Sequence, residues 1–478
     1  MGNVENANRE GVMKEKKLNA ITIRVAIIGA LAGLLFGMDI AYVNGSLDLI
    51  VKNFSLSLTQ SQHVASTLLV GAAIGAIFSG FLSRRFGRKV VLIIAALIFT
   101  VFTFVGVFAP NFDALLVSRF VVGLAVGIAS FISPLYLSEI APKEFRGGII
   151  AMYQFMITIG IFLMYLCNSA LSSTGSWRIM LASIAIPSII MLLGCLTLPR
   201  SPRWLILTGQ EEKALVVLKR IRDNDEEAYK EADEIKNTTN IKGGGFKMLR
   251  HGFFLKVLLL GILLQAFQQF TGMNAFMYYS TDIFKMAGFS NPAVATIVIG
   301  LVNVLTTILA IKYVDKFGRK PILYFGLSLL VLSCLIVGIV FKTHYSVELI
   351  NNLPVSHMQL SSAVQWITLI FCLVFIFGFA ISMGPMIWII CSEIQPLEGR
   401  DFGITASTTS NWVCNAILGN FALTWLTFAP GNTFFGFGLV CLVCMFFTKF
   451  FVPETKGVSL EQIEQNLKSG KRLAHIGR

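Results

Sequence analysis

Long apolar runs dominate this chain of 478 residues. A helix needs about 20 apolar residues to cross the hydrocarbon core of a bilayer. Apolar residues make up 55% of the chain and charged residues only 14%, against roughly 25% charged residues in a soluble domain. The sequence therefore predicts an all-α integral membrane protein with twelve transmembrane helices, at 25–48, 63–83, 89–109, 113–137, 147–171, 178–198, 254–281, 290–312, 321–341, 364–391, 402–427 and 433–452.

Lysine and arginine gather in every second loop, in both terminal segments and in the central segment. Short loops that are rich in these residues stay on the cytoplasmic side of a membrane, so we expect both termini to be cytoplasmic. The net charge of +13 also suits nucleic-acid binding, but a charge confined to alternate loops indicates a lipid bilayer and no nucleic acid. The loop residues are Arg84, Arg85, Arg88, Lys89, Lys143, Arg146, Lys316, Arg319, Lys320 and Arg400.

The two halves of the chain repeat each other. The pentapeptide Arg85–Lys89 recurs as Lys316–Lys320, and Glu139 and Glu393 each precede an arginine by seven residues. The spacing of 254 residues from 139 to 393 also separates the proline motifs that begin at 199 and 453. The pattern indicates a duplicated six-helix unit, as in transporters whose two halves rock against each other. The predicted segments are an N-terminal tail (1–21), an N-terminal half (22–199), a cytoplasmic linker with short amphipathic helices (200–250), a C-terminal half (251–453) and a C-terminal tail (454–478).

One stretch within the apolar runs is unusually polar. Leu264–Tyr279 contains three glutamines, one asparagine, a glycine and a pair of tyrosines. Amide groups in hydrocarbon are costly unless a partner satisfies them. They then mark a neighbouring helix, a water-filled cavity or a substrate. One glutamine suits a helix contact, whereas the whole cluster favours a hydroxyl-bearing solute held at the middle of the membrane.

Two charged residues lie inside the runs. At ~1.5 Å per residue, Asp39 lies about 22 Å from the inner face and Arg119 roughly 12 Å below the outer face. In a core about 30 Å thick, the two charges are at similar depth and can meet across the bundle. Burial favours the neutral carboxyl group and a nearby arginine favours the charged one. The pair is therefore either a permanent structural contact or a proton carrier whose affinity changes with the distance between the two groups.

The repeated loops carry the motifs of a known family. The segments Gly80–Lys89, Asp315–Lys320, Gln268–Asn274 and Pro453–Gly457 resemble those of the sugar porters of the major facilitator superfamily. The segments Cys391–Leu397 and Gly399–Thr405, and more weakly Ile476–Gly477, are similar to those of the bacterial arabinose–proton and galactose–proton symporters. The chain also resembles xylose–proton symporters and glucose facilitators. Two residues depart from the family pattern, since Arg84 and Arg200 stand where acidic residues are usual.

The resemblance implies a sugar site. An amide group both donates and accepts hydrogen bonds, so it can serve adjacent sugar hydroxyls, and an indole covers the apolar face of the sugar ring. Each of these residues has packing or helix contact as an alternative role. Tyr278 and Tyr279 either gate the outer side or lie in an interfacial belt. The implied sugar-binding residues are Gln154, Gln268, Gln269, Asn274, Asn303, Trp388, Asn411 and Trp412.

The resemblance also implies a proton role and a charge network. Proton-coupled sugar porters have an aspartate at the position of Asp39, where passive relatives commonly have a neutral residue, so Asp39 and Arg119 are expected to couple the proton. A second set either locks the outward-open state by pairing across helix ends, or consists of topogenic charges and surface pairs. Its members are Arg88, Glu139, Arg146, Arg319, Glu393 and Arg400.

The expected function is import of a monosaccharide with a proton by alternating access. Arabinose, galactose, xylose and glucose remain open as substrates, because one hydroxyl or hydroxymethyl group discriminates only modestly between them. A facilitative uniporter and a sensor that binds sugar without transport are the alternatives. We expect no enzyme activity, no metal and no cofactor apart from the proton, in a functional monomer in a bacterial inner membrane.

Overall fold

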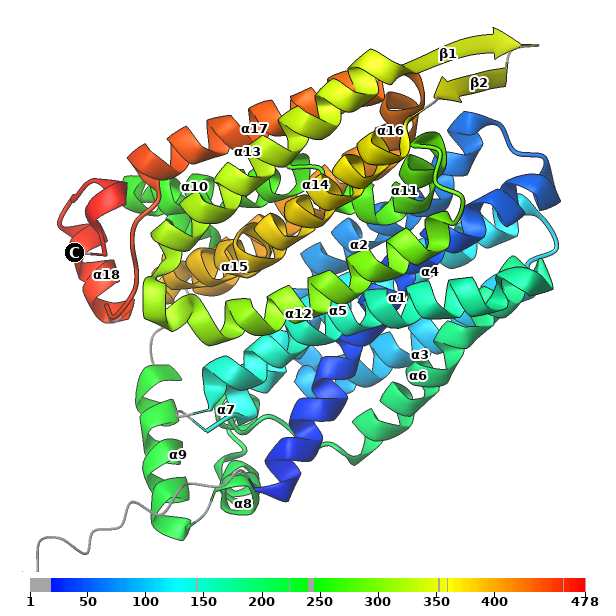
Figure 1. Ribbon diagram of the computed structural model, residues 1–478. Helices are drawn as coiled ribbons and strands as arrows, with labels where there is room; N and C mark the ends of the chain where they lie inside the picture. Colours follow the sequence, from blue (N-terminus) through cyan, green and yellow to red (C-terminus); the bar gives the residue numbers. More distant parts are fainter. Residues whose placement is uncertain are drawn as a thin grey trace, which may run out of the picture.

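The computed structural model describes residues 19–142, 145–222, 224–239, 245–350, 353–358, 360–458 and 460–477. Eleven helical segments in these ranges are long and apolar enough to cross a membrane. The twelfth predicted segment is α16 (Arg400–Phe428), a helix of 29 residues in which serine, threonine and asparagine lower the hydropathy. The prediction of twelve transmembrane helices is therefore confirmed, and Figure 1 shows them as one elongated bundle.

Close backbone contacts hold the N-terminal half together. A Cβ atom on Gly71 of α2 would lie 2.2 Å from the carbonyl oxygen of Phe120, and one on Gly127 of α4 would lie 2.0 Å from that of Ala72. Only glycine permits such an approach, which is typical of packed membrane helices. The helices of this half are α1 (Ala20–Phe54), α2 (Leu58–Phe86), α3 (Arg88–Val107), α4 (Phe112–Ile140), α5 (Arg146–Leu171), the short η1 (Ser172–Thr174) and α6 (Trp177–Thr197).

Two spans of the C-terminal half are broken at mid-length. Gly272, with φ of 91°, separates α10 from α11, and a Cβ there would lie 2.4 Å from the ring of Phe437. Ser382, with φ of −121° and ψ of −85°, separates α14 from α15. The elements of this half are α10 (Gly252–Phe270), α11 (Met273–Met286), α12 (Pro292–Phe317), α13 (Arg319–His344), α14 (Ser362–Ile381), α15 (Met383–Glu393), η3 (Leu397–Gly399), α16 and α17 (Pro430–Phe451).

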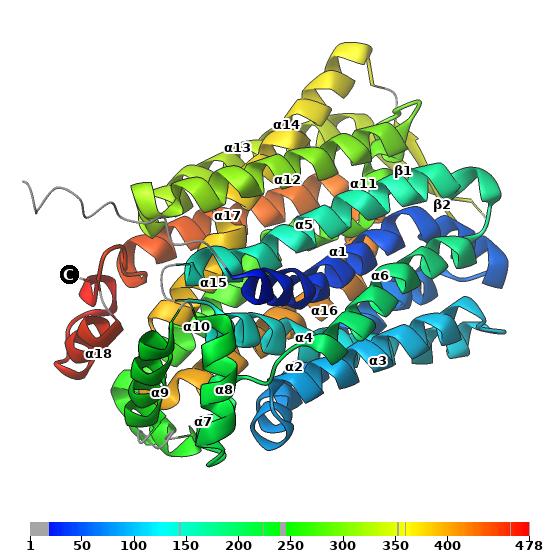
Figure 2. The same ribbon diagram turned by 90° about the horizontal axis from the view of Figure 1, so that it is seen from below.

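Short helices cover one end of the bundle, which we name the linker end. Apolar residues on one face of α8 are buried there, among them Leu218 and Ile221. Arg222 ties the linker to α4, because it donates to the carbonyl oxygen of Ile140 at 2.9 Å and pairs with Glu231 at 2.5 Å. Figures 1 and 2 both show these helices and α18 at the same end. They are α7 (Pro202–Leu207), α8 (Glu211–Ile221), α9 (Asp225–Thr239), η2 (Gly245–Arg250), α18 (Leu460–Lys468) and η4 (Leu473–His475).

A small antiparallel hairpin marks the opposite end, which we name the hairpin end. Its strands are β1 (Tyr345–Ile350) and β2 (Leu353–Met358), with Tyr345 opposite Met358 in the register. The hydroxyl of Tyr345 donates to the carbonyl oxygen of Thr427 at 2.5 Å and joins the hairpin to α16. The all-α membrane fold is confirmed, since the hairpin lies between the ninth and tenth apolar runs and adds no strand to the membrane-spanning bundle.

Candidate functional site

The two charges that lie inside the apolar runs form an ion pair. Asp39 of α1 and Arg119 of α4 are each 2% exposed, and Nη1 of Arg119 lies 2.5 Å from Oδ1 of Asp39. The guanidinium also lies over the ring of Tyr42, 5.4 Å from its centroid. The other carboxylate oxygen, Oδ2, has no hydrogen-bond partner among the described residues. The structure thus places both groups in one buried contact that leaves one carboxylate oxygen available.

Amide side chains of α10 and α16 form a connected cluster. The side-chain nitrogen of Asn411 donates to the side-chain oxygens of Gln265 at 2.6 Å and Gln268 at 2.7 Å. In turn, the side-chain nitrogen of Gln268 donates to the backbone oxygens of Met383 at 2.7 Å and Gly384 at 3.1 Å. The cluster therefore joins α10 to α16 and joins α10 to the break between α14 and α15. Gln265 was present in the polar stretch of the sequence, but it was not assigned to the site.

A second amide pair spans the break between α10 and α11. Asn274 donates to the side-chain oxygen of Gln269 at 2.7 Å. Gln269 is 5% exposed, and Asn274 is half-buried. One amide pair of the polar stretch therefore bridges the break at Gly272.

The remaining residues of the predicted sugar site are spread over four helices. Trp412 of α16 is buried against Phe36 of α1, with ring centroids 5.0 Å apart, and its indole N–H has no partner in the described part of the chain. Gln154 of α5 and Trp388 of α15 are half-buried, and Asn303 of α12 is buried. Among the contacts described, none joins these last three side chains to the amide cluster.

The paired tyrosines of α11 are in the interior. Tyr278 and Tyr279 are 2% and 0% exposed. Their hydroxyls donate to the side-chain oxygen of Asn415 at 3.1 Å and to the backbone oxygen of Gly419 at 3.2 Å, both in α16. The alternative of an interfacial belt does not agree with this burial, whereas a gating role remains a prediction.

Several residues not identified from the sequence join the two halves near the hairpin end. Asn44 of α1 donates to the backbone oxygen of Met277 at 3.1 Å and to the hydroxyl of Ser280 at 2.8 Å. Tyr165 of α5 donates to the same Met277 oxygen at 2.9 Å. The sequence offered one signal for Asn44, which is a polar residue inside an apolar run, five positions after Asp39. These bonds hold the half-helix α11 against the N-terminal half.

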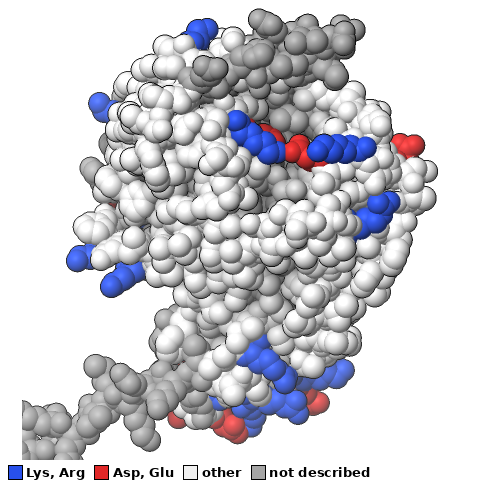
Figure 3. Space-filling view, turned by 45° about the vertical axis from the view of Figure 1, so that its right-hand side comes forward, with Lys and Arg blue, Asp and Glu red and all other residues white. Residues whose placement is uncertain are grey.

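Charged side chains also cross between the halves at this end. Lys285 of α11 pairs with Asp48 of α1, and it lies 3.5 Å from Asp282 on its own helix. Figure 3 shows acidic and basic side chains next to each other on the face near the hairpin, where the surface is hollowed. The sequence analysis did not predict this pairing, because it depends on the contact between α1 and α11.

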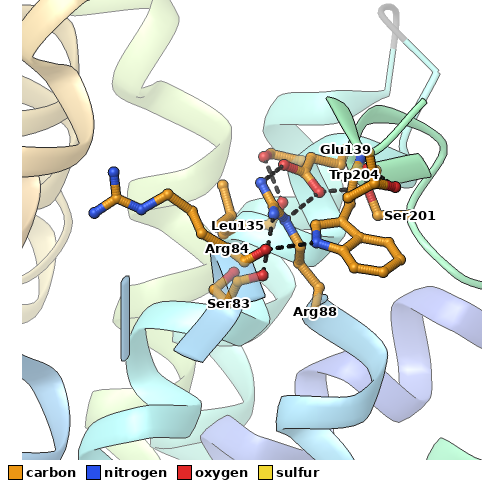
Figure 4. Close-up of polar contacts among 9 residues, drawn as sticks. Ser83, Arg84, Arg88, Leu135, Glu139, Ser201 and Trp204 are labelled. Atoms are coloured by element: carbon orange, nitrogen blue, oxygen red, sulfur yellow. Dashed lines mark hydrogen bonds and ion pairs between the residues drawn. The ribbon is translucent and has the colours of Figure 1, made fainter. Parts of the chain in front are cut away.

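The predicted charge network lies at the linker end and is duplicated. Arg88 contacts both carboxylate oxygens of Glu139, at 2.8 and 2.6 Å, and Ser201 donates to Glu139 at 2.5 Å (Figure 4). In the second half, Arg319 pairs with Glu393 at 2.8 Å and Thr455 donates to Glu393 at 2.5 Å. The step from 201 to 455 is again 254 residues, as from 139 to 393.

The pairs of this network join helix ends within each half. The Arg88 and Glu139 side chains are 8% and 2% exposed, so they are not a surface pair. Arg400 donates to the backbone oxygen of Ser392 at 2.9 Å. The side chain of Arg146 lies outside the described part of the structure. Pairing across helix ends is therefore present, while its effect on the conformational equilibrium remains a prediction.

The two departures from the family pattern lie beside this network, against Trp204. The indole N–H of Trp204 donates to the backbone oxygen of Arg84 at 3.0 Å (Figure 4), and the guanidinium of Arg200 lies 5.6 Å from the centroid of the Trp204 ring. In the C-terminal half, the residue equivalent to Arg200 is Glu454. Its carboxylate accepts hydrogen bonds from the backbone N–H groups of residues 319 and 320, at the start of α13. The duplication is therefore exact in the glutamate pairs and broken at this helix cap.

Known proteins are similar to this chain in sequence and in fold. Residues 25–467 match the family model described as "Sugar (and other) transporter". The chain is 44% identical to the galactose-proton symporter of Escherichia coli strain K12, over 96% of this chain and 97% of that protein. It is 42% identical to the arabinose-proton symporter of the same strain, over 95% of each chain.

A solved structure extends the comparison to three dimensions. The major facilitator superfamily proton:xylose symporter XylE, bound to 6-bromo-6-deoxy-D-glucose, superposes with a TM-score of 0.79 at 29% identity, covering 93% of this chain and 98% of that one. The match covers nearly the whole of both chains, so the likeness is not limited to one motif. This chain belongs to the sugar transporter family of the major facilitator superfamily.

Proposed function

We propose that this protein is a secondary active transporter that imports a monosaccharide together with a proton by alternating access. The relatives above are named as proton symporters of galactose, arabinose and xylose. The observation that carries the proposal in this chain is the buried pair of Asp39 and Arg119, in which one carboxylate oxygen has no partner among the described residues. A buried carboxylate with a free oxygen can accept a proton.

Proton coupling follows from the two opposing effects on that carboxylate. Contact with the guanidinium favours the charged form, and burial favours the neutral form. Asp39 and Arg119 are on different helices of the N-terminal half, so a change in the spacing of α1 and α4 changes the balance. Asp39 then takes up a proton in one conformation and releases it in the other.

Sugar binding is assigned to the amides and indoles near the two broken helices. The amides of Gln268, Gln269 and Asn411 supply both donors and acceptors, and the indole of Trp412 supplies an apolar face and one free donor. Trp412 packs on Phe36, which is three residues before Asp39 on α1. A sugar at this position therefore lies next to the helix that carries the proton.

The proposed orientation puts the linker end and both termini in the cytoplasm of a bacterial cell, with the protein in the inner membrane. The basic loops support this assignment. With the hairpin end outside, the bonds from Asn44 and Tyr165 to α11 close the outer path in the conformation described. We propose a functional monomer, because both halves of the path belong to one chain.

Uptake into vesicles tests the proposal. Labelled galactose, arabinose, xylose and glucose are offered with and without an inward proton gradient, to the wild type, to Asp39→Asn and to the control Asp113→Asn, an exposed carboxylate near the start of α4. We expect the gradient to drive accumulation in the wild type and the control, and Asp39→Asn to exchange sugar without accumulating it. Absence of uptake of all four sugars by the wild type contradicts the proposal.

A facilitative uniporter is the second candidate. In this function the contact between Arg119 and Asp39 stays closed in every conformation and has only a structural role. In that case uptake by the wild type equilibrates and ignores the proton gradient. The same vesicle experiment therefore separates the two functions.

A further inference from the structure

The amide of Gln268 is bound to the break between α14 and α15. Its nitrogen donates to the backbone oxygens of Met383 at 2.7 Å and Gly384 at 3.1 Å. These are the first two residues of α15, directly after the non-helical Ser382. Pro385, the next residue, has no N–H group. The start of α15 is therefore held by a side chain of another helix.

The donors of this amide are fully used in the structure. A primary amide has two hydrogens, and the two backbone oxygens take both. The oxygen of Gln268 accepts from Asn411, whose nitrogen also donates to Gln265. Gln265 is 0% exposed and Gln268 is 3% exposed. The orientation of the Gln268 amide is thus set on one side by Gln265 and Asn411 and on the other by the break.

We propose that the sugar and the helix break compete for the amide of Gln268. In this proposal, which rests on the sugar-transport function proposed above, a sugar hydroxyl accepts the hydrogen bonds that now go to Met383 and Gly384. Gln265 acts as a positioning residue, because it holds Asn411 and through it the Gln268 amide. Sugar binding then releases the start of α15, so that the ligand is recognised and the helix is freed in one exchange of hydrogen bonds.

The released helix connects the sugar site with the linker end. α15 is 11 residues long, from Met383 to Glu393. Trp388, a predicted sugar contact, lies in its middle, and Glu393, at its end, pairs with Arg319 and accepts from Thr455. Movement at the first turn of so short a helix therefore reaches the charge network of the C-terminal half.

Backbone hydrogen exchange of residues 382–393, followed by mass spectrometry on the full-length protein in detergent, tests the clamp without any ligand. The variant Gln268→Glu keeps an acceptor for Asn411 and loses the amide donors, and Gln268→Met, of similar length, loses both. The matched control is Gln269→Glu. Gln269 lies on the same helix as Gln268 and is also a predicted sugar contact, but among the described contacts its side chain bonds to Asn274 and not to the break between α14 and α15. Because no sugar is present in this arm, a change in sugar affinity cannot alter the exchange of any of the three variants.

We expect exchange in 382–393 to be about ten-fold faster in both Gln268 variants than in the wild type, which corresponds to about 1.4 kcal/mol, the order of one to two net hydrogen bonds. Gln269→Glu is expected to exchange at the wild-type rate. Wild-type exchange in both Gln268 variants overturns the proposal, and so does equal acceleration in all three variants.

A second arm adds galactose, arabinose, xylose or glucose, with binding followed by calorimetry. A sugar that binds is expected to accelerate exchange in 382–393 of the wild type, and no sugar is expected to change it in Gln268→Glu. Binding without any acceleration in the wild type overturns the exchange of hydrogen bonds. If no monosaccharide binds, the transport function fails, and the ligand-free comparison still decides whether Gln268 clamps the break.

Discussion

The ion pair between Asp48 and Lys285 is predicted to hold the hairpin end closed. It joins α1 of one half to α11 of the other, so separating the halves at this end breaks it. Lys285 also lies 3.5 Å from Asp282 on its own helix, and that contact persists when the halves separate. Removing either partner of the inter-half pair is therefore expected to favour the conformation that is open at the hairpin end.

The exposure of the two side chains limits the size of this effect. Lys285 is 46% exposed and Asp48 is 54% exposed, and ion pairs in such positions contribute about 0.2–1 kcal/mol. Since 1.4 kcal/mol corresponds to a factor of ten, the populations are expected to shift by about five-fold at most. High salt screens exposed charges, so the shift is expected to fall as the salt concentration rises.

A double-mutant cycle with distance measurements tests this prediction. The variants are Asp48→Asn, Lys285→Gln and the double variant. Spin labels on cysteines at Thr59 and Ser290, which are exposed near the hairpin end on opposite halves, report the separation by electron–electron double resonance. The labelled wild type with the same two cysteines is the reference.

The outcome of the cycle is specific to the pair. If the two residues act through their mutual contact, the double variant shows the same shift as the larger single variant, because partners in contact are not additive. Independent shifts that add in the double variant would refute the reasoning. So would single variants with the same distance distribution as the reference.

Three further predictions concern other contacts between helices. Glu139→Gln leaves the guanidinium of Arg88 buried without its charge partner, so we expect a loss of about 3–5 kcal/mol of stability, seen as a lower melting temperature in detergent; an unchanged temperature contradicts it. Glu454→Gln weakens the cap on the backbone N–H of Arg319, so we expect the free energy of unfolding to fall by about 1 kcal/mol. The same melting assay measures this change, and a gain in stability contradicts the prediction. Tyr165→Phe removes one hydrogen bond to α11, so we expect the conformation closed at the hairpin end to lose about 1 kcal/mol of stability. The distance between spin labels at the hairpin end is then expected to increase, and an unchanged distance argues against a closing role.

The membrane fold was predictable because its physical cause is local. A bilayer about 30 Å thick requires runs of about 20 apolar residues, and each run is visible in the sequence without knowledge of its neighbours. The break at Gly272 has a local cause as well, because glycine adopts a positive φ through its own backbone. The β-hairpin at 345–358 was not predicted, because its strands pair beyond the apolar runs that guided the assignment.

The candidate site was predictable only as a set of residue types. Amides and charges are expensive in hydrocarbon, so Asp39, Arg119 and Gln268 were conspicuous in the sequence. Their depth along α1 and α4 even indicated that the two charges can meet. Which amide contacts which carbonyl depends on the crossing of helices that are more than 100 residues apart, as for Gln268 and Met383.

The sequence by itself determined the membrane class, the twelve spans, the duplication and the identity of the polar residues inside the bundle, because these depend on composition and on spacing along one chain. Only the tertiary structure decided that Asn44 and Tyr165 converge on one backbone oxygen of α11, that Lys285 faces Asp48, and that the Gln268 amide is already occupied. The physical reason is that hydrogen bonds and ion pairs are short-ranged and directional. They form only where packing brings the polar atoms of distant helices to within about 3 Å of each other.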